Sequence, residues 1–173
     1  MTTNTRRDHP AALSSDELSA ECDVQFVRRS GPGGQHRNKV STAVVVLHKP
    51  TGVKSEANER RSQAENRAVA IRRLRVRLAL EVRVERGPGS VPSLLWRSRL
   101  RGGRIAVSPA HDDFPALLAE AIDAIHACEF DPKAASEMLG CSSSQLLKFL
   151  QKEPQAIALV NRQRQQRGEH PLR

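Results

Sequence analysis

The stretch VSTAVVVLH, residues 40–48, is followed by the tetrapeptide KPTG, residues 49–52. The first stretch is β-branched and apolar at both alternating positions, which indicates a buried central strand. The tetrapeptide has Pro at its second position and Gly at its fourth, as a type I turn favours. Val53, Ser55 and Ala57 alternate beyond the turn. We therefore expect a central strand, a tight turn and a returning strand.

Further elements are expected on both sides of this pair. Residues 1–12 have the composition of a tail, residues 14–18 begin a short helix capped by Ser, and residues 24–29 form another strand. From Arg60 onward, small and apolar residues recur at spacings of three and four, which predicts an amphipathic helix ending at residues 87–89. The fold class predicted is α+β, with a small mixed or antiparallel sheet packed against an arginine-rich helix.

The remainder of the chain is predicted to be an all-α module. Helices are expected over residues 117–128, from Asp131-Pro132 to Gly140, from Ser142 in a capping box with Gln145, and over residues 154–160. Residues 87–103 are rich in Pro, Gly, Ser and Arg and predict a boundary or loop, with a short strand at residues 105–107. The expected organisation is a tail and short helix (1–22), an α+β domain (23–108), a helical module (109–161) and a basic tail (162–173).

The positive charge of the chain is concentrated in its middle. The net charge is +9, with 28 Lys and Arg against 19 Asp and Glu. Residues 24–104 hold 19 Lys and Arg against five Glu, a net of +14, whereas residues 1–23 carry −3 and residues 105–173 carry −2. A segment this basic predicts contact with nucleic acid.

The sequence also argues against several classes of protein. No apolar run approaches the roughly 20 residues that a membrane span needs. Cys22, Cys128 and Cys141 form no CxxC pair and no zinc-like cluster with His, so we expect reduced thiols, no metal and no cofactor. The N-terminus has no apolar secretory stretch, and the acids that follow Arg6 and Arg7 fit a mitochondrial presequence poorly. A cytoplasmic protein is the expectation.

The run Gly31-Pro32-Gly33-Gly34-Gln35-His36 requires a loop between the first two strands. Gly33 and Gly34 allow backbone angles barred to other residues and close approach of another backbone. Gln35 then offers a backbone N–H together with the donor and acceptor of its amide. Taken alone, the tripeptide is more often a flexible turn than a site.

Its surroundings are more specific. The run from Arg28 to Leu78 resembles the catalytic domain of class I peptide-chain release factors and their small ribosome-rescue relatives. The matching residues are 29–36, Asn38-Lys39, 41–43, 48–52, 59–63 and 66–68. Arg37 stands where the family usually has an aliphatic residue, and Ala64-Glu65 stand where it often has His-Lys.

The resemblance implies hydrolysis of the ester that links a nascent peptide to tRNA in the peptidyl-transferase centre of the ribosome. Its catalytic residues would be Gly33, Gly34 and Gln35. The backbone N–H of Gln35 would stabilise the oxyanion, and its side chain would admit water and exclude larger nucleophiles. His36 supports the loop, stacks on RNA or acts as a base, and Asn38 is either a turn residue or an RNA contact. Methylation of the Gln is a family property that the sequence does not reveal.

The expected partners are ribosomal RNA of the large subunit and the 3′ end of peptidyl-tRNA, with the mRNA channel as a further contact. We expect a monomer, because the ribosomal site takes one copy. The residues expected to bind RNA are basic or lie beside the loop: Arg29, His36, Arg37, Lys39, Lys49, Arg60, Arg61, Arg67, Arg72, Lys148, Arg162 and Arg164.

About 30 residues precede the GGQ tripeptide, too few for a codon-recognition domain, so codon-independent release is expected. Residues 131–150 resemble a helix-turn-helix, in which Ser143, Ser144, Gln145 and Lys148 would lie on the exposed face of the second helix. An ordinary helical hairpin is the alternative for this segment. For the whole protein, the alternative to a hydrolase is a non-catalytic ribosome- or nucleic-acid-binding protein.

Overall fold

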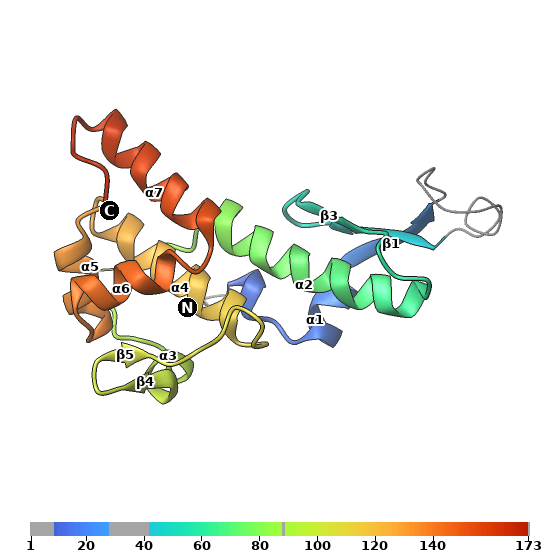
Figure 1. The fold of residues 1–173 in the computed structure, drawn as a ribbon, viewed down its shortest axis with the longest axis horizontal. Helices are drawn as coiled ribbons and strands as arrows, with labels where there is room; N and C mark the ends of the chain where they lie inside the picture. Colours follow the sequence, from blue (N-terminus) through green and yellow to red (C-terminus); the bar gives the residue numbers. More distant parts are fainter. Residues whose placement is uncertain (1–8, 28–41, 88, 173) are drawn as a thin grey trace, which may run out of the picture. The chain divides into compact units, whose positions relative to one another are not determined.

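The computed structural model describes residues 9–27, 42–87 and 89–172. The chain divides into two compact units, residues 1–81 and residues 82–173. The first unit contains a three-stranded sheet and the long helix α2, and the second contains helices α3 to α7 (Figure 1). The α+β fold class with a following helical module is thereby confirmed.

The sheet of the first unit is antiparallel, in the order β1-β2-β3. Its strands are β1 (Cys22–Val27), β2 (Ala43–His48) and β3 (Lys54–Ala57). The central strand is β2, as its composition predicts, and its residues Ala43, Val44 and Val46 are buried. The turn between β2 and β3 closes through a 2.8 Å hydrogen bond from the Gly52 N–H to the His48 carbonyl oxygen.

Two short helical elements precede the sheet. Helix α1 (Ser15–Ala20) is capped by Ser14, whose side chain accepts from the Glu17 N–H in a complete capping box, which confirms the predicted start. The 3-10 turn η1 (Pro10–Ala12) has Ala11 fully buried, so the expectation of a tail is wrong for these residues. The cause is tertiary, since η1 packs against helix α2.

Helix α2 (Gln63–Glu81) lies against β2 and β3 and buries Ala70, Ile71, Leu74 and Leu78. The expected periodicity is therefore confirmed, but the helix ends at Glu81 and not at residues 87–89. Beyond Glu81 the backbone is no longer helical, and the N–H of Val84 donates to the Asp123 carboxylate 3.3 Å away. That side-chain acceptor replaces the carbonyl that a longer helix would have offered.

The second unit surrounds one almost completely buried helix, α4 (Phe114–Ala127), in which residues 114–125 are all buried. The ring of Phe114, the first residue of α4, lies with its centroid 5.6 Å from that of Phe149, whose centroid is 5.7 Å from that of Trp96. The other elements are α3 (Leu94–Arg99), β4 (Leu100–Arg101), β5 (Arg104–Ile105), α5 (Pro132–Leu139), α6 (Ser143–Leu150) and α7 (Pro154–Gln166).

Local chemistry accounts for the boundaries of α5 and α6. The Asp131 side chain accepts from the Lys133 N–H and Pro132 opens α5, while Gly140 ends it in the left-handed region at φ 67°. The Ser142 side chain then caps α6 by accepting from the Gln145 N–H. The three residues between α5 and α6 agree with a helix-turn-helix connection.

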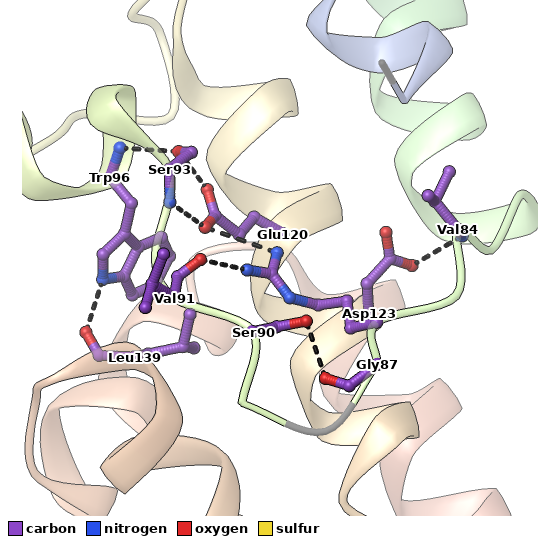
Figure 2. A network of polar contacts seen from close by, with 10 residues as sticks. Val84, Gly87, Ser90, Val91, Ser93, Trp96, Glu120, Asp123 and Leu139 are labelled. Carbon is purple, nitrogen blue, oxygen red and sulfur yellow. Dashed lines mark hydrogen bonds and ion pairs between the residues drawn. The ribbon is translucent and has the colours of Figure 1, made fainter. Parts of the chain in front are cut away.

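The segment after Glu81 belongs to the second unit because carboxylates of α4 hold it (Figure 2). Glu120 accepts hydrogen bonds from the Ser93 N–H at 2.7 Å and the Ser93 hydroxyl at 2.5 Å, and Arg86 lies 3.4 Å from it. The Trp96 ring N–H donates to the Leu139 carbonyl oxygen at 2.9 Å. These contacts set the division of the chain at residue 81, whereas the sequence predicts a domain end at residue 108.

The C-terminal helix also differs from expectation. Helix α7 continues to Gln166, so residues 162–166 of the expected tail are helical. The half-buried Arg164 donates to the Phe130 carbonyl oxygen at 2.6 Å, and the Asn161 amide bonds the backbone of Leu172. Phe130 lies 34 residues from Arg164, and Leu172 lies 11 residues from Asn161. The local sequence pattern of the tail does not reveal these contacts.

The three cysteines are free and half-buried, as expected, and burial raises the pKa of each thiol. Across the residues that the structure describes, none of the helices is both long and apolar enough to cross a bilayer.

Candidate functional site

The connection between β1 and β2 carries the candidate catalytic residues. Gly33, Gly34 and Gln35 lie outside the described residues, as do the expected RNA-binding residues Arg29, His36, Arg37 and Lys39. Its two ends are described, because Val27 of β1 pairs with Ala43 of β2 in the antiparallel register. The connection therefore starts and finishes on adjacent strands of one rigid sheet.

Asn66 fixes the second of these ends. It lies in the first turn of α2 and is completely buried. Its side-chain amide donates to the Thr42 carbonyl oxygen at 2.7 Å and to the Arg60 carbonyl oxygen at 2.9 Å, and its amide oxygen accepts from the Arg60 N–H at 2.9 Å. One side chain thus joins the start of β2, the segment before α2 and the helix itself. A buried amide with these partners is a strong positional constraint, since losing one leaves polar groups unsatisfied.

Three further side chains hold α2 against the returning strand β3. The buried Ser55 hydroxyl donates to the Ala70 carbonyl oxygen at 2.7 Å. Arg73 donates to the Glu56 carbonyl oxygen at 2.8 Å and pairs with Glu59, and Arg77 donates to the Lys54 carbonyl oxygen. The sheet and helix α2 are therefore held together by hydrogen bonds as well as by apolar packing.

The opposite end of β2 is held by His48, which is 1% exposed. Its Nδ1 lies 2.7 Å from the Thr51 hydroxyl and its Nε2 lies 3.0 Å from the Glu21 carboxylate. This arrangement ties the β2–β3 turn to the segment between α1 and β1. The adjacent Lys49 is exposed on the turn, where it can reach a polyanion.

The arginines of the first unit fall into two sets. Arg73, Arg75 and Arg77 bond groups of the unit itself; Arg75 is buried and donates to the Ala11 carbonyl oxygen at 3.2 Å. Arg60, Arg61 and Arg67 are exposed, and no carboxylate among the described residues pairs with them. Arg72 is also exposed, but it interacts with other groups of the chain and is not counted in either set. The second set is the one available to phosphates.

The expected RNA-binding residues of the second unit differ in the same way. Lys148 on α6 and Arg162 on α7 are exposed. Arg164 is half-buried, and besides its bond to Phe130 it pairs with Glu169 at 2.7 Å. Of the expected exposed face of α6, Ser144 and Lys148 are exposed, whereas Ser143 is half-buried and its hydroxyl lies 3.0 Å from that of Ser136.

Asn66, Ser55 and Arg73 hold the sheet and helix α2 together, although the sequence does not single them out as site residues. Asn66 and Ser55 bond groups 15 to 24 residues away, which no local pattern reveals. A signal for Asn66 does exist, since Asn is unfavourable inside a helix unless its amide has a specific partner.

Comparison with known proteins concerns this first unit. Residues 15–88 match the model of the RF-1 domain family. Over 65 residues the chain is 45% identical to the human mitochondrial translation release factor in rescue, a match that covers 38% of each chain. Over 67 residues it is 46% identical to peptide chain release factor 1 of Verminephrobacter eiseniae (strain EF01-2), covering 39% of this chain and 19% of that protein.

A third relative is the rat mitochondrial peptide chain release factor 1-like protein, 51% identical over 55 residues that cover 32% of this chain and 15% of the relative. The chain therefore aligns with between 15% and 38% of the length of these relatives. The family match lies on the segment that carries the glycine-rich motif, the sheet and helix α2, in keeping with the resemblance seen in the residues. Residues 15–88 match the RF-1 domain, and these matches support a relationship of this segment to the class I peptide-chain release factors.

Proposed function

We propose that the protein hydrolyses the peptidyl-tRNA ester on stalled ribosomes, independently of a stop codon, through Gly33, Gly34 and Gln35. The observation that carries this proposal is the intact GGQ tripeptide with its flanking motif inside the segment that matches the RF-1 domain. The buried Asn66 supports it, because its bond to Thr42 holds an end of the loop that carries the tripeptide. A protein that only bound nucleic acid would have no need of this combination.

The chemistry requires few protein groups. Water attacks the ester carbonyl carbon and gives up a proton, the bond from that carbon to the tRNA 3′ oxygen breaks, and the 3′ oxygen takes up a proton, giving a free peptide and a deacylated tRNA. The carbonyl oxygen carries negative charge in the transition state, and we assign the backbone N–H of Gln35 as its donor. The Gln35 amide shapes the space for water, and Gly33 and Gly34 let the loop approach the tRNA end.

The partners follow from the charge of the exposed surface. Arg60, Arg61 and Arg67, unpaired with any described carboxylate, would contact phosphates of large-subunit RNA or tRNA, with Lys49 adding charge at the β2–β3 turn. Arg29, His36, Arg37 and Lys39 would contribute from the loop. Lys148 and Arg162 are proposed contacts of the second unit, toward ribosomal RNA or the mRNA channel. We propose a monomer that acts in the cytoplasm.

Codon independence is the sharper part of the proposal. It is supported by the similarity to a relative whose name includes rescue. The test is peptide release from ribosomes that hold peptidyl-tRNA with a stop codon, a sense codon or no codon in the A site. Release without a stop codon at a rate equal to or above that with one supports codon independence, and release strictly dependent on a stop codon contradicts it.

A second candidate is a non-catalytic nucleic-acid-binding protein. It is favoured by one observation, the α5–α6 connection of three residues with Gly140 in the left-handed region. In this case, replacing Gln35 by Ala would leave every activity of the protein unchanged. Loss of peptide release in that variant, with ribosome binding retained, separates the hydrolase from the binder.

A further inference from the structure

The sequence LRGGR, residues 100–104, forms a small hairpin in the second unit. Strands β4 and β5 pair antiparallel, with Leu100 opposite Ile105 and Arg101 opposite Arg104. Gly102 and Gly103 make the two-residue connection at φ 53° and 74°, the backbone that a type I′ turn needs. Ile105 is buried against α3 and α6. Because strand neighbours alternate in direction, Arg101 and Arg104 lie on the opposite face and are exposed.

This pair of arginines is unfavourable for the fold. Two like charges directly opposite one another on a two-stranded ladder repel each other. Within the part of the chain that the structure describes, no carboxylate pairs with Arg101 or Arg104. Arg97, exposed on α3 four residues before Arg101, is likewise without an ion pair to the described residues. We call Arg97, Arg101 and Arg104 the arginine hairpin.

The neighbouring Arg99 differs from these three arginines, because its charge is paired within the unit. Arg99 donates to the Asp113 carboxylate, with Nε at 2.8 Å and Nη2 at 2.5 Å. Residues 86–111 contain five Arg and no Asp or Glu, and the carboxylates that pair with this segment in the described part of the chain, Asp113 and Glu120, bond Arg99 and Arg86 and not the arginine hairpin. The repulsion is thus left for an external anion to relieve.

The tip of the hairpin is open. A Cβ added at Gly102 or Gly103 would meet nothing within 4 Å. A bulky polyanion backbone can therefore approach the turn that joins Arg101 and Arg104. Planar guanidinium groups bind phosphates through paired N–H donors, which makes arginine well suited to this surface.

We propose that the arginine hairpin binds the phosphate backbone of ribosomal RNA and anchors the second unit on the ribosome. The identity of the RNA rests on the proposed function, but the phosphate-binding surface does not. RNA is favoured over an acidic protein because phosphates offer repeated anionic partners to arginines, and because the aromatic side chains of the second unit, which anchor many protein interfaces, are all buried. It differs from the expected α6 surface, which exposes one cation, Lys148.

The experiment measures binding of the full chain to purified ribosomes over a range of salt concentrations. Arg101→Gln with Arg104→Gln should weaken binding by about tenfold and lower the salt slope by about two, one for each phosphate that the variant no longer neutralises. Arg101→Lys with Arg104→Lys keeps the charge and should keep most of the slope. Lys133→Gln with Arg167→Gln removes two exposed charges elsewhere in the unit and should leave the slope nearly unchanged.

The outcomes separate this inference from the hydrolase proposal. If the wild type releases peptide and the Arg-to-Gln pair leaves the salt slope unchanged, the proposed role of the arginine hairpin is wrong and the hydrolase proposal is retained. Absence of wild-type release with a lowered slope would overturn the hydrolase and support the hairpin. If Val91→Ser with Leu94→Ser, at the exposed apolar residues nearby, weakens binding while the Arg-to-Gln pair does not, the surface contacts protein and the RNA assignment is wrong.

Discussion

The side-chain amide of Asn66 donates to the Thr42 carbonyl oxygen at 2.7 Å, across 24 residues of sequence. Thr42 is the first described residue after the loop that carries Gly33, Gly34 and Gln35, and Asn66 belongs to the helix that supports the sheet. The amide therefore couples the position of the loop end to the helix that packs against the sheet of the first unit. Much of the proposed function depends on this coupling, because a preorganised N–H is effective only if it is held in place.

Replacing Asn66 by Ala is predicted to lower the free energy of unfolding by about 2–3 kcal/mol, because the part-buried backbone groups of Thr42 and Arg60 lose a fully buried partner. Chemical denaturation measures this change. Glu65→Ala, at the exposed neighbouring position, is the control and should change stability by less than about 0.5 kcal/mol. Equal effects of the two substitutions would show that Asn66 does not anchor the loop.

The two sets of arginines predict opposite phenotypes. Arg61→Gln with Arg67→Gln should reduce the salt slope of ribosome binding by about two and leave the thermal midpoint nearly unchanged. Arg73→Gln should lower the thermal midpoint, because Arg73 bonds the Glu56 carbonyl and pairs with Glu59. The same salt slope in both variants would refute this division.

His48 and Lys49 are neighbours with separable roles. His48→Leu is expected to cost about 1–2 kcal/mol of stability, since it removes the bonds to Thr51 and Glu21 from a fully buried position. Lys49→Gln should weaken ribosome binding and leave stability unchanged. Measuring both quantities for both variants checks the separation, and a binding defect confined to His48→Leu would contradict it.

Asp123 predicts a pH dependence in the second unit. Burial raises the pKa of this carboxyl from 3.8 to about 6, although Arg83 and the Val84 N–H lower it. The folded chain then holds the proton more tightly than the unfolded chain, so stability from this group is full below pH 4 and is lost as pH rises to about 6. Two units of pKa correspond to about 3 kcal/mol.

The measurement is the difference in unfolding free energy between the wild type and Asp123→Asn as a function of pH. The variant should gain about 3 kcal/mol relative to the wild type between pH 4 and pH 7. Its lost ion pair with Arg83 adds an offset, and the change with pH isolates the titration. A side-chain carboxyl resonance of Asp123 titrating below pH 4.5 would refute the prediction.

The sequence predicts best where structure follows from neighbouring residues. Several helix ends follow from the caps and backbone angles of residues close in sequence. The predicted ends are confirmed at Ser14, Pro132, Gly140 and Ser142. The predicted end of α2 at residues 87–89 is wrong: the helix ends at Glu81, and the N–H of Val84 beyond it bonds Asp123, 39 residues away, which no local pattern reveals. Helix α3 lies in a segment rich in Pro and Gly that predicts a loop, although Ser93 caps it and its Trp96 enters the core.

The candidate site likewise has features that neighbouring residues reveal and features that depend on tertiary packing. The motif from Arg29 to Gln35 is visible in the sequence because its residues are consecutive, and so is the basic character of α2. Which arginines serve the fold and which remain exposed depends on the carbonyl oxygens of β3, whose positions only the packed unit defines. The hydrogen bonding of Asn66 is a tertiary property for the same reason.

The most direct test of the hydrolase is the rate of peptide release from ribosomes stalled on an mRNA without a stop codon. Wild-type protein is compared with Gln35→Ala and Gly34→Ala, and ribosome binding is measured alongside. We predict release by the wild type and loss of release by about 100-fold or more in both variants, with binding retained, as for the loss of an oxyanion donor or its placement. No release by the wild type, or equal release by all three proteins, would contradict the proposal.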